Sequence, residues 1–275
     1  MERQKRVAVI HDLAGYGRCA LAVALPVISA EGLECCVLPT SILSSNAAFP
    51  GYYRDDGTER MERFLSHWDE LDLEFDGIYV GYLGSAAGIE LAAEFLKRFR
   101  RENTIVLFDP VMGDHGRLYS ACSPEVCEKM EDLLAYSDVI TPNLTEAYRL
   151  AGLEYPDEHP SGEALWELEE RLCAKGPSEV VLTGIAEGED LVNQICSRDG
   201  SRSRIPARRS GGDRCGTGDV FASIVFAEIV RGRGTEQAVK KAAGFLEEAI
   251  AYTEQSKVPS RNGVCFEPFL YRLIQ

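Results

Sequence analysis

Residues 211–219 read Gly-Gly-Asp-Arg-Cys-Gly-Thr-Gly-Asp and lead directly into an apolar run with helical spacing. Glycine can adopt a positive φ and exposes its backbone N–H, and the N-terminus of a helix carries partial positive charge. The turn Gly216-Thr217-Gly218 therefore predicts an anion-binding hole at a helix start. Asp219, in the first turn of that helix, could accept a proton from a substrate hydroxyl, or it could serve only as a helix cap.

Short β-type runs alternate with amphipathic helical runs along the rest of the chain, which is typical of an α/β domain with a largely parallel sheet and helices on both faces. The predicted strands are residues 6–10, 34–38, 77–80, 104–108, 139–141, 179–183 and 190–197. The predicted helices are residues 17–30, 58–71, 87–101, 123–135, 144–151, 161–175, 219–230 and 236–254, with a short one at 267–274. An Asp199-Gly200 turn predicts a hairpin and thus an antiparallel edge. We expect a single domain, residues 1–275.

The composition narrows the classes of partner. A net charge of −15 opposes binding to nucleic acid and to anionic membrane surfaces. Nine cysteines without a C-x-x-C pair indicate neither a disulfide framework nor a zinc site. The apolar stretch at residues 7–10 is too short for a signal peptide or a membrane span, so we expect a cytosolic protein.

A second candidate site follows the predicted strand 104–108. Asp109 and Asp114 lie five residues apart at its end, and ligands of doubly wound sheets collect at the carboxyl ends of strands. Two carboxylates there could hold Mg²⁺ against the phosphates of ATP. Asp, Pro and Gly also favour turns, so a plain turn is the alternative.

A third candidate site follows the predicted strand 139–141. Asn143 and Glu146 have the spacing of a helix N-cap and its third helical residue, so they could form a capping box. Glu146 could also reach a hydrated metal near the phosphates, and the two roles are compatible. Thr183 closes another predicted strand and offers a hydroxyl to a nucleotide.

Near the N-terminus, Gly15 and Gly17 fit the G-x-G-x-x-A pattern of dinucleotide binding. The glycines do not follow the strand in a tight turn, and the second strand lacks the acid that binds ribose, so a dehydrogenase is disfavoured. His11 and Asp12 could line a substrate pocket or form a structural pair. Neither a G-x-S-x-G elbow nor a Walker lysine motif occurs in the chain.

Taken in order, these segments resemble the ribokinase-like superfamily and, more narrowly, the pyridoxal/pyridoxamine kinases. The segments are the loop with Gly15 and Gly17, residues 44–46, 109–114 and 141–146, and Gly216 to Asp219. The resemblance covers nearly the whole chain. It implies a ribokinase-like three-layer α/β/α sandwich and phosphorylation of the 5′-hydroxymethyl group of a vitamin B6 vitamer. It also implies the use of ATP with Mg²⁺, in some relatives a monovalent cation such as K⁺, and a homodimer.

The resemblance also implies roles for individual residues. Asp219 matches the catalytic base, and Gly216, Thr217 and Gly218 match the anion hole. The nucleotide and metal positions correspond to Asp109, Asp114, Thr141, Asn143, Glu146 and Thr183. The substrate positions correspond to Asp12, Ser45, Ala47 and Tyr82, and the Tyr82 ring is suited to packing on a flat heteroaromatic ring.

Two positions depart from the relatives. Asn46-Ala47-Ala48 stands where many of them carry His-Thr-Gly, and Asp12 stands where several carry Ser. A carboxylate at Asp12 would favour the cationic aminomethyl group of pyridoxamine. The alternatives are a hydroxymethylpyrimidine kinase, with the same chemistry on another heteroaromatic, and a binding protein that has lost catalysis.

Overall fold

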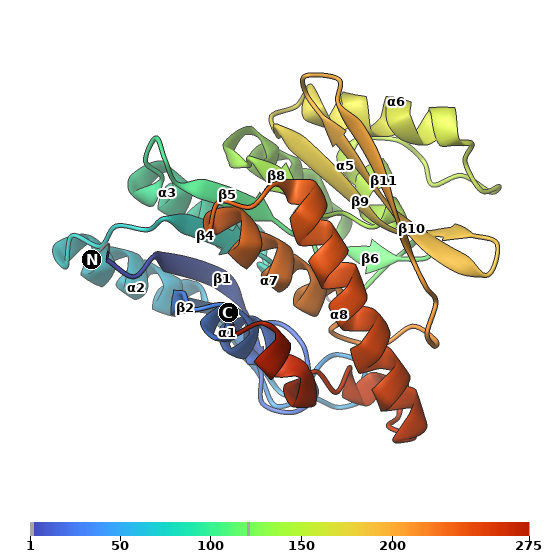
Figure 1. Ribbon diagram of the computed structural model, residues 1–275. Helices are drawn as coiled ribbons and strands as arrows, with labels where there is room; N and C mark the ends of the chain where they lie inside the picture. The colour runs from blue at the N-terminus through green and yellow to red at the C-terminus, as the bar shows by residue number, and fades with distance from the viewer. Residues whose placement is uncertain (1–2, 120–121, 275) are drawn as a thin grey trace.

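The computed structural model describes residues 3–119 and 122–274, in which a nine-stranded sheet lies between two layers of helices (Figure 1). Its strand order is β11-β10-β9-β8-β5-β4-β1-β2-β3. The strands are β1 (Arg6–Ala14), β2 (Glu34–Leu43), β3 (Arg54–Asp56), β4 (Gly77–Val80), β5 (Ile105–Phe108), β8 (Val139–Ile140), β9 (Glu179–Glu187), β10 (Asp190–Ser197) and β11 (Arg202–Ala207). Pairing is parallel from β9 through β2, and β10, β11 and β3 run antiparallel to their neighbours. A separate small hairpin joins β6 (Gly113–Asp114) to β7 (Arg117–Leu118).

Helices cover both faces of the sheet. One face packs against α1 (Leu21–Ala30), α7 (Thr217–Val230) and α8 (Thr235–Gln255). The other packs against α2 (Thr58–Glu70), α3 (Ala86–Phe99), α4 (Pro124–Met130), α5 (Leu144–Leu150) and α6 (Gly162–Cys173). Three 3₁₀ turns, η1 (Glu131–Tyr136), η2 (Ser260–Asn262) and η3 (Glu267–Arg272), complete the described chain. This is the predicted α/β sandwich.

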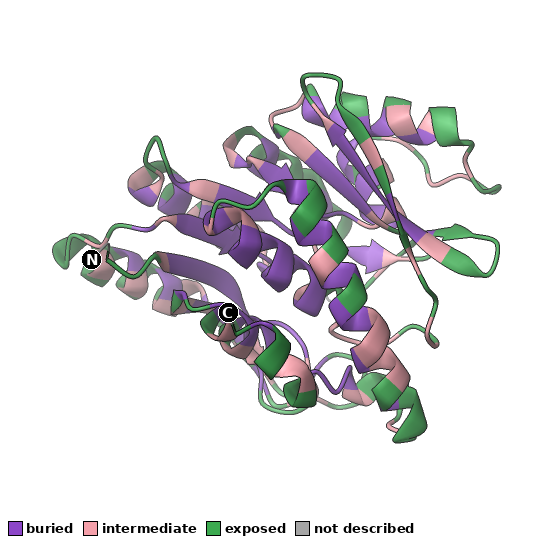
Figure 2. Ribbon diagram, viewed as in Figure 1, coloured by how far each residue is buried: buried purple, intermediate pink, exposed green. Residues whose placement is uncertain are grey.

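The central strands are buried on both faces, as Figure 2 shows by the continuous purple of the sheet. Because side chains alternate along a strand, Val7 and Val9 of β1 pack toward α1 and α7, whereas Ala8 and Ile10 pack toward α2 and α3. His11 continues the row of Val7 and Val9. The alternation therefore directs its ring to the face that α7 covers.

Most predicted strands and helices are confirmed, including the hairpin of β10 and β11, in which Gly200 has a φ of 89°. The first helix starts at Leu21 rather than at residue 17, because Gly17 and Ala20 have φ values of 88° and 52° that no α-helix accommodates. No strand was predicted between residues 38 and 77, but β3 lies there and pairs with β2. The last segment forms a 3₁₀ turn rather than an α-helix. Within the described residues, none of the helices has the length and apolarity needed to cross a membrane.

Candidate active site

Most of the side chains predicted for the site lie at the carboxyl ends of neighbouring strands, next to the start of α7 (Figure 1). Asp109 follows β5, Thr141 follows β8, and Tyr82 follows β4 two residues on. Asp12 lies near the end of β1, where the pairing of this strand with β2 shifts register. Ends of parallel strands meet at one edge of a sheet, which explains why residues so far apart in sequence come together.

The turn before α7 has the backbone of an anion hole. Gly216 is the N-cap residue with a φ of 77°, and a Cβ there would lie 2.0 Å from the carbonyl oxygen of Arg18, so only glycine fits. Around Gly218 a Cβ would meet open space. In the described part of the chain, the N–H groups of Gly218 and Asp219 donate to none of the backbone carbonyls, as expected in a first helical turn. The hydroxyl of Thr217 donates to the carbonyl of Arg214 at 3.0 Å.

Asp219 contacts a buried histidine. Nε2 of His11 lies 3.0 Å from Oδ1 of Asp219, an ion-pair distance, although the N–H direction is not that of a well-aligned hydrogen bond. On the other side of the ring, Nδ1 of His11 lies 2.8 Å from Oδ1 of Asp12. Burial alone would lower the pKa of His11, but its contacts with Asp12 and Asp219 outweigh burial and raise that pKa to about 10. The two carboxylates therefore favour the imidazolium form of His11, although the backbone N–H of Asp12 also lies 3.0 Å from Nδ1.

Asp109 is a third buried carboxylate in this group. Burial, followed by repulsion from Asp219, raises its pKa to about 7. The Tyr79 hydroxyl donates to Oδ2 of Asp109 at 3.3 Å. The nearby Thr141 hydroxyl is buried and interacts with the Asp109 carboxylate, without the geometry of a well-formed hydrogen bond. A buried acid that is costly to ionise, next to a hydroxyl oxygen, is chemically suited to a cation such as Mg²⁺.

Glu146 forms the predicted capping box with Asn143, the N-cap of α5. Its Oε2 accepts from the N–H of Asn143 at 2.9 Å, and its Oε1 accepts from the N–H of Met112 at 3.1 Å. Burial and the charge of Asp109 raise the pKa of Glu146 well above its usual value. Since both oxygens are already hydrogen bonded, Glu146 is better placed to bind a hydrated metal than to ligate one directly.

Two residues predicted for the nucleotide side, Asp114 and Thr183, are less buried than Asp109 and Glu146. Asp114 is half-buried, and its Oδ1 accepts from the N–H of His115 at 2.8 Å. The hydroxyl of Thr183 donates to the carbonyl of Pro142 at 3.3 Å. Among the described residues there is no group of three His, Cys, Asp or Glu side chains arranged to hold a metal ion. A bound cation would thus need oxygen atoms from a ligand or from water.

On the substrate side, Tyr82 is buried and the guanidinium of Arg54 lies 5.7 Å from the centre of its ring. Burial raises the pKa of Tyr82 to about 12, so the phenol stays neutral. Ser45 is half-buried and Ala47 is exposed. Asn46 secures their loop, because its Nδ2 donates to the carbonyl of Arg261 at 2.9 Å. His11 therefore links Asp12 to Asp219, whereas in the part of the chain that the structure describes no contact joins Asp219 to Ser45 or Ala47.

Sequence reasoning missed two contacts. Arg54 reaches Tyr82 because β3 pairs with β2, and the guanidinium donates to the carbonyl of Gly84 at 2.7 Å. The only signal was a polar, aromatic segment between strand and helix. The contact of His11 with Asp219 could have been inferred from the alternation along β1 had the partner helix been known.

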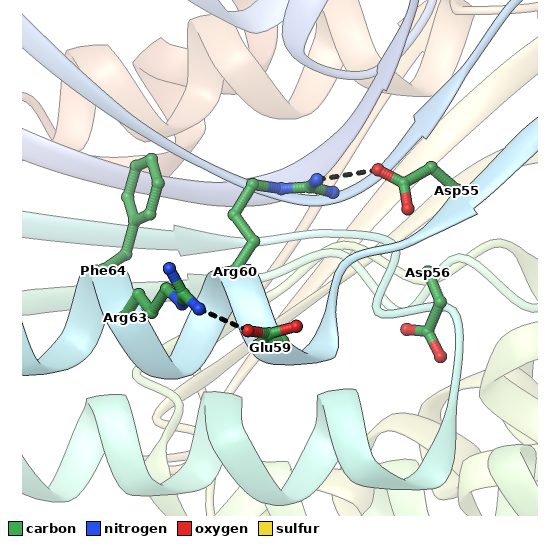
Figure 3. A pocket seen from close by; sticks show the side chains of 6 residues that line it. All are labelled: Asp55, Asp56, Glu59, Arg60, Arg63 and Phe64. Carbon is green, nitrogen blue, oxygen red and sulfur yellow. Dashed lines mark hydrogen bonds and ion pairs between the residues drawn. The ribbon is translucent and has the colours of Figure 1, made fainter.

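A hollow of about 390 Å³ lies away from this site, lined by Asp55, Asp56, Glu59, Arg60, Arg63 and Phe64 (Figure 3). Figure 3 shows Arg60 directed at Asp55 and Arg63 directed at Glu59, at 2.8 Å and 2.5 Å. These charges pair with one another on the surface. The hollow therefore offers no set of groups comparable to that around Asp219.

Comparison with known proteins gives a consistent result. The profile of the phosphomethylpyrimidine kinase family matches residues 61–264. The chain is 28% identical to a pyridoxine/pyridoxal/pyridoxamine kinase of Bordetella avium, over 93% of this chain and 90% of that one.

Solved structures agree. A Bacteroides thetaiotaomicron protein described as a phosphomethylpyrimidine kinase and crystallised with pyridoxal has a TM-score of 0.94 and 32% identity, covering 99% of this chain and 96% of that one. The pyridoxal kinase of Leishmania donovani in complex with ADP and pyridoxamine has a TM-score of 0.86 and 26% identity, covering 98% and 96%. A kinase profile over most of the chain and kinase structures over nearly all of it lead to one conclusion: this chain is a kinase that belongs to the pyridoxal kinase family of the ribokinase-like superfamily.

Proposed function

We propose that this kinase transfers the γ-phosphoryl group of ATP to the 5′-hydroxymethyl group of a vitamin B6 vitamer, with Asp219 as general base. The observation that carries the proposal is the position of Asp219, in the first turn of α7, among N–H groups that lack backbone acceptors. A base beside an anion hole is the pair of groups that phosphoryl transfer to an alcohol requires. The pyridoxal and pyridoxamine complexes of related structures support the choice of acceptor.

In this step the hydroxyl oxygen of the vitamer attacks the γ-phosphorus while Asp219 takes the hydroxyl proton. The O–H bond breaks and a new P–O bond forms. The bond from the γ-phosphorus to the bridging oxygen breaks, and its electron pair leaves with ADP. The N–H groups of the turn Gly216-Thr217-Gly218 and of Asp219 stabilise the charge on the phosphoryl oxygens.

On the nucleotide side, Asp109, Thr141, Asn143, Glu146 and Thr183 would surround the phosphates and the base of ATP. Mg²⁺, when bound, neutralises charge on the phosphate oxygens. Asp109 and Thr141 would hold it, with Asp114 and Glu146 reaching its water ligands. The ADP complex of a relative supports nucleotide binding in this fold.

On the substrate side, we propose that the Tyr82 ring packs against the pyridine ring and that Asp12, Ser45 and Ala47 border it. Asp12 is already paired with His11, which reduces its attraction for a cationic group on the substrate. This pairing weakens the physical basis for a preference for pyridoxamine. We expect pyridoxal and pyridoxamine to be used with similar kcat/KM.

A second candidate acceptor is hydroxymethylpyrimidine, since a relative with 30% identity is a hydroxymethylpyrimidine/phosphomethylpyrimidine kinase. This acceptor presents the same group, a hydroxymethyl on a flat heteroaromatic ring. The chemistry at Asp219 would be unchanged. Only the contacts of the ring would differ.

The test is a panel of acceptors with MgATP, measured by release of ADP: pyridoxal, pyridoxamine, pyridoxine, hydroxymethylpyrimidine and ribose. We expect the highest kcat/KM for a B6 vitamer. Turnover of hydroxymethylpyrimidine alone would support the second candidate, and turnover of ribose alone would contradict both.

We also propose that residues 1–275 act as one domain in a homodimer. Exposed apolar side chains, such as Leu25, Ile42 and Tyr53, are compatible with a subunit contact. Sedimentation velocity at micromolar concentration tests this. A monomer at all concentrations would contradict it.

A further inference from the structure

A chain of three charged side chains joins the end of β1 to the start of α7. The imidazole of His11 stands between the carboxylates of Asp12 and Asp219, at 2.8 Å and 3.0 Å. The ring is 2% exposed, and the two carboxylate side chains are 10% and 12% exposed. A ring whose two nitrogens both face carboxylate oxygens satisfies them best when both nitrogens carry hydrogen, which is the imidazolium form.

The ring of His11 is held from all sides. Tyr79 packs edge-on against it, with ring centres 5.9 Å apart and planes at 87°. On the neighbouring strand end, a Cβ at Gly81 would lie 2.0 Å from Cδ2 and 2.3 Å from Nε2 of the ring. Glycine at position 81 therefore makes room for the imidazole, and the imidazole has no space in which to turn away.

The charges around the ring explain what it contributes. Asp12, Asp109 and Asp219 are three acids in a largely buried region. Without an opposing cation, a buried carboxylate at position 219 would move away from its neighbours or take up a proton. Either change would weaken Asp219 as a base.

We propose that His11 is a positioning residue that fixes Asp219 for catalysis. It binds Oδ1 of Asp219, so that Oδ2 is the oxygen presented to the substrate hydroxyl, and it links the base to Asp12 on the substrate side. His11 itself touches no reacting atom. This inference rests on the proposed function, because it takes Asp219 as the base.

The first experiment compares His11→Leu, which removes both contacts, with His11→Gln, whose amide can still donate one hydrogen bond to Asp219. Activity is measured with pyridoxal and MgATP, and folding by circular dichroism and the midpoint of thermal unfolding. We expect His11→Leu to lower kcat by ~100-fold, the cost of a misplaced catalytic group, with little change in the KM for ATP. His11→Gln should recover about tenfold of that loss. The matched control is His67→Gln, at an exposed histidine of α2, which should leave kcat unchanged.

The second experiment asks whether His11 acts through Asp219. In an Asp219→Asn background, His11→Leu should cause no further loss, because residues that act as a unit are not additive. A loss equal to that in the wild-type background would overturn the inference. Equal losses of kcat in His11→Leu and His11→Gln, each accompanied by a fall in thermal stability, would also overturn the inference, because they would indicate a purely structural residue.

The two hypotheses fail in distinguishable ways. An Asp219→Asn enzyme that turns over normally would refute the base and the inference with it. An inactive Asp219→Asn enzyme with a fully active His11→Leu enzyme would refute the inference alone. If His11→Leu does not fold, the double-mutant comparison with Asp219→Asn is made with His11→Gln instead. A further variant, Gly81→Ala, displaces the imidazole ring without removing it and should also lower kcat.

Discussion

Two clusters of buried charged side chains lie at opposite ends of α7, and they differ in the ratio of acidic to basic side chains. The first, which we call the acidic cluster, consists of His11, Asp12, Asp109 and Asp219 at the start of the helix. The second, the balanced cluster, consists of Glu31, Glu228, Arg231 and Lys241 at its end. In the balanced cluster Lys241 lies 2.8 Å from Glu31 and 2.9 Å from Glu228, and Arg231 lies 2.7 Å from Glu31.

The difference separates structure from function. Two acids and two cations in the balanced cluster form ion pairs with one another, so no net charge is left for a ligand. Three acids and one histidine in the acidic cluster leave surplus negative charge, and repulsion from Asp219 adds to burial in raising the pKa of Asp109. Buried charge without a partner is costly, and such sites are characteristic of ligand-binding and catalytic centres.

The largest expected effect concerns the acidic cluster. Asp219→Asn keeps the size of the side chain but removes its ability to accept the hydroxyl proton, so kcat should fall by roughly 10³-fold. The fold should persist, because the substitution also removes repulsion from Asp109. Steady-state kinetics with pyridoxal measure kcat, and circular dichroism measures folding. A variant that loses its fold along with its activity would break the distinction between the clusters.

The opposite result is expected in the balanced cluster. Lys241→Met leaves the fully buried Glu31 with one cation fewer, which should lower the free energy of unfolding by about 1–3 kcal/mol. The kcat of the folded enzyme should not change. Urea denaturation and kinetics at 25 °C provide the test, with Lys240→Met as the matched control, since Lys240 is exposed and pairs only on the surface with Glu236. A selective loss of kcat would show that this cluster also serves catalysis.

These clusters mark what the sequence could and could not predict. Asp109 and Asp219 were predicted as site residues because their positions at a strand end and a helix start are visible in local patterns, whereas Thr141 was predicted only from the family resemblance. The His11–Asp219 and Glu31–Lys241 contacts join residues about 210 positions apart in sequence, and they depend on which face of the sheet α7 and α8 cover. Local patterns carry no information on that choice.

The same reason accounts for errors in the fold. The alternation of strands and helices predicted the sandwich, but β3 exists only because three polar residues, Arg54–Asp56, pair with the end of β2. The delayed start of α1 follows from the positive φ of Gly17 and Ala20. The second of these is an alanine, a residue that rarely adopts this conformation, so composition gave no warning.

A smaller effect is expected at a buried acid outside both clusters. Glu169 of α6 forms no salt bridge with any of the described residues. Burial raises its pKa to about 8, and Gln194 donates a hydrogen bond to it at 2.5 Å. The folded state thus holds a proton that the unfolded state releases above pH 4.5, so this group costs stability as the pH rises from 4.5 to 8. Glu169→Gln should therefore be more stable than wild type at pH 8, by about 1–2 kcal/mol, and equal to it at pH 4.

Urea denaturation at the two pH values measures this difference, and kcat at pH 8 should be unchanged. The prediction extends the comparison of the two clusters to an unpaired buried acid. If a proton neutralises Glu169, this residue needs no ligand and affects stability but not catalysis. A pH-independent difference in stability would contradict the protonated state, and a fall in kcat would give Glu169 a functional role.

The smallest expected effect concerns the loop that carries Ala47, which we propose borders the substrate. Its backbone is fixed by Asn46, through hydrogen bonds to the carbonyl of Arg261 and from the N–H of Ala48, while the side chain of Ala47 is exposed. Ala47→Thr therefore adds a hydroxyl without disturbing the loop. If Ala47 borders the vitamer, one new hydrogen bond should lower the KM for pyridoxal by up to about tenfold and leave kcat unchanged, because Asp219 and His11 are not altered. Ala48→Thr, one position along the same exposed segment, is the control; an equal change in both variants would place neither residue at the substrate.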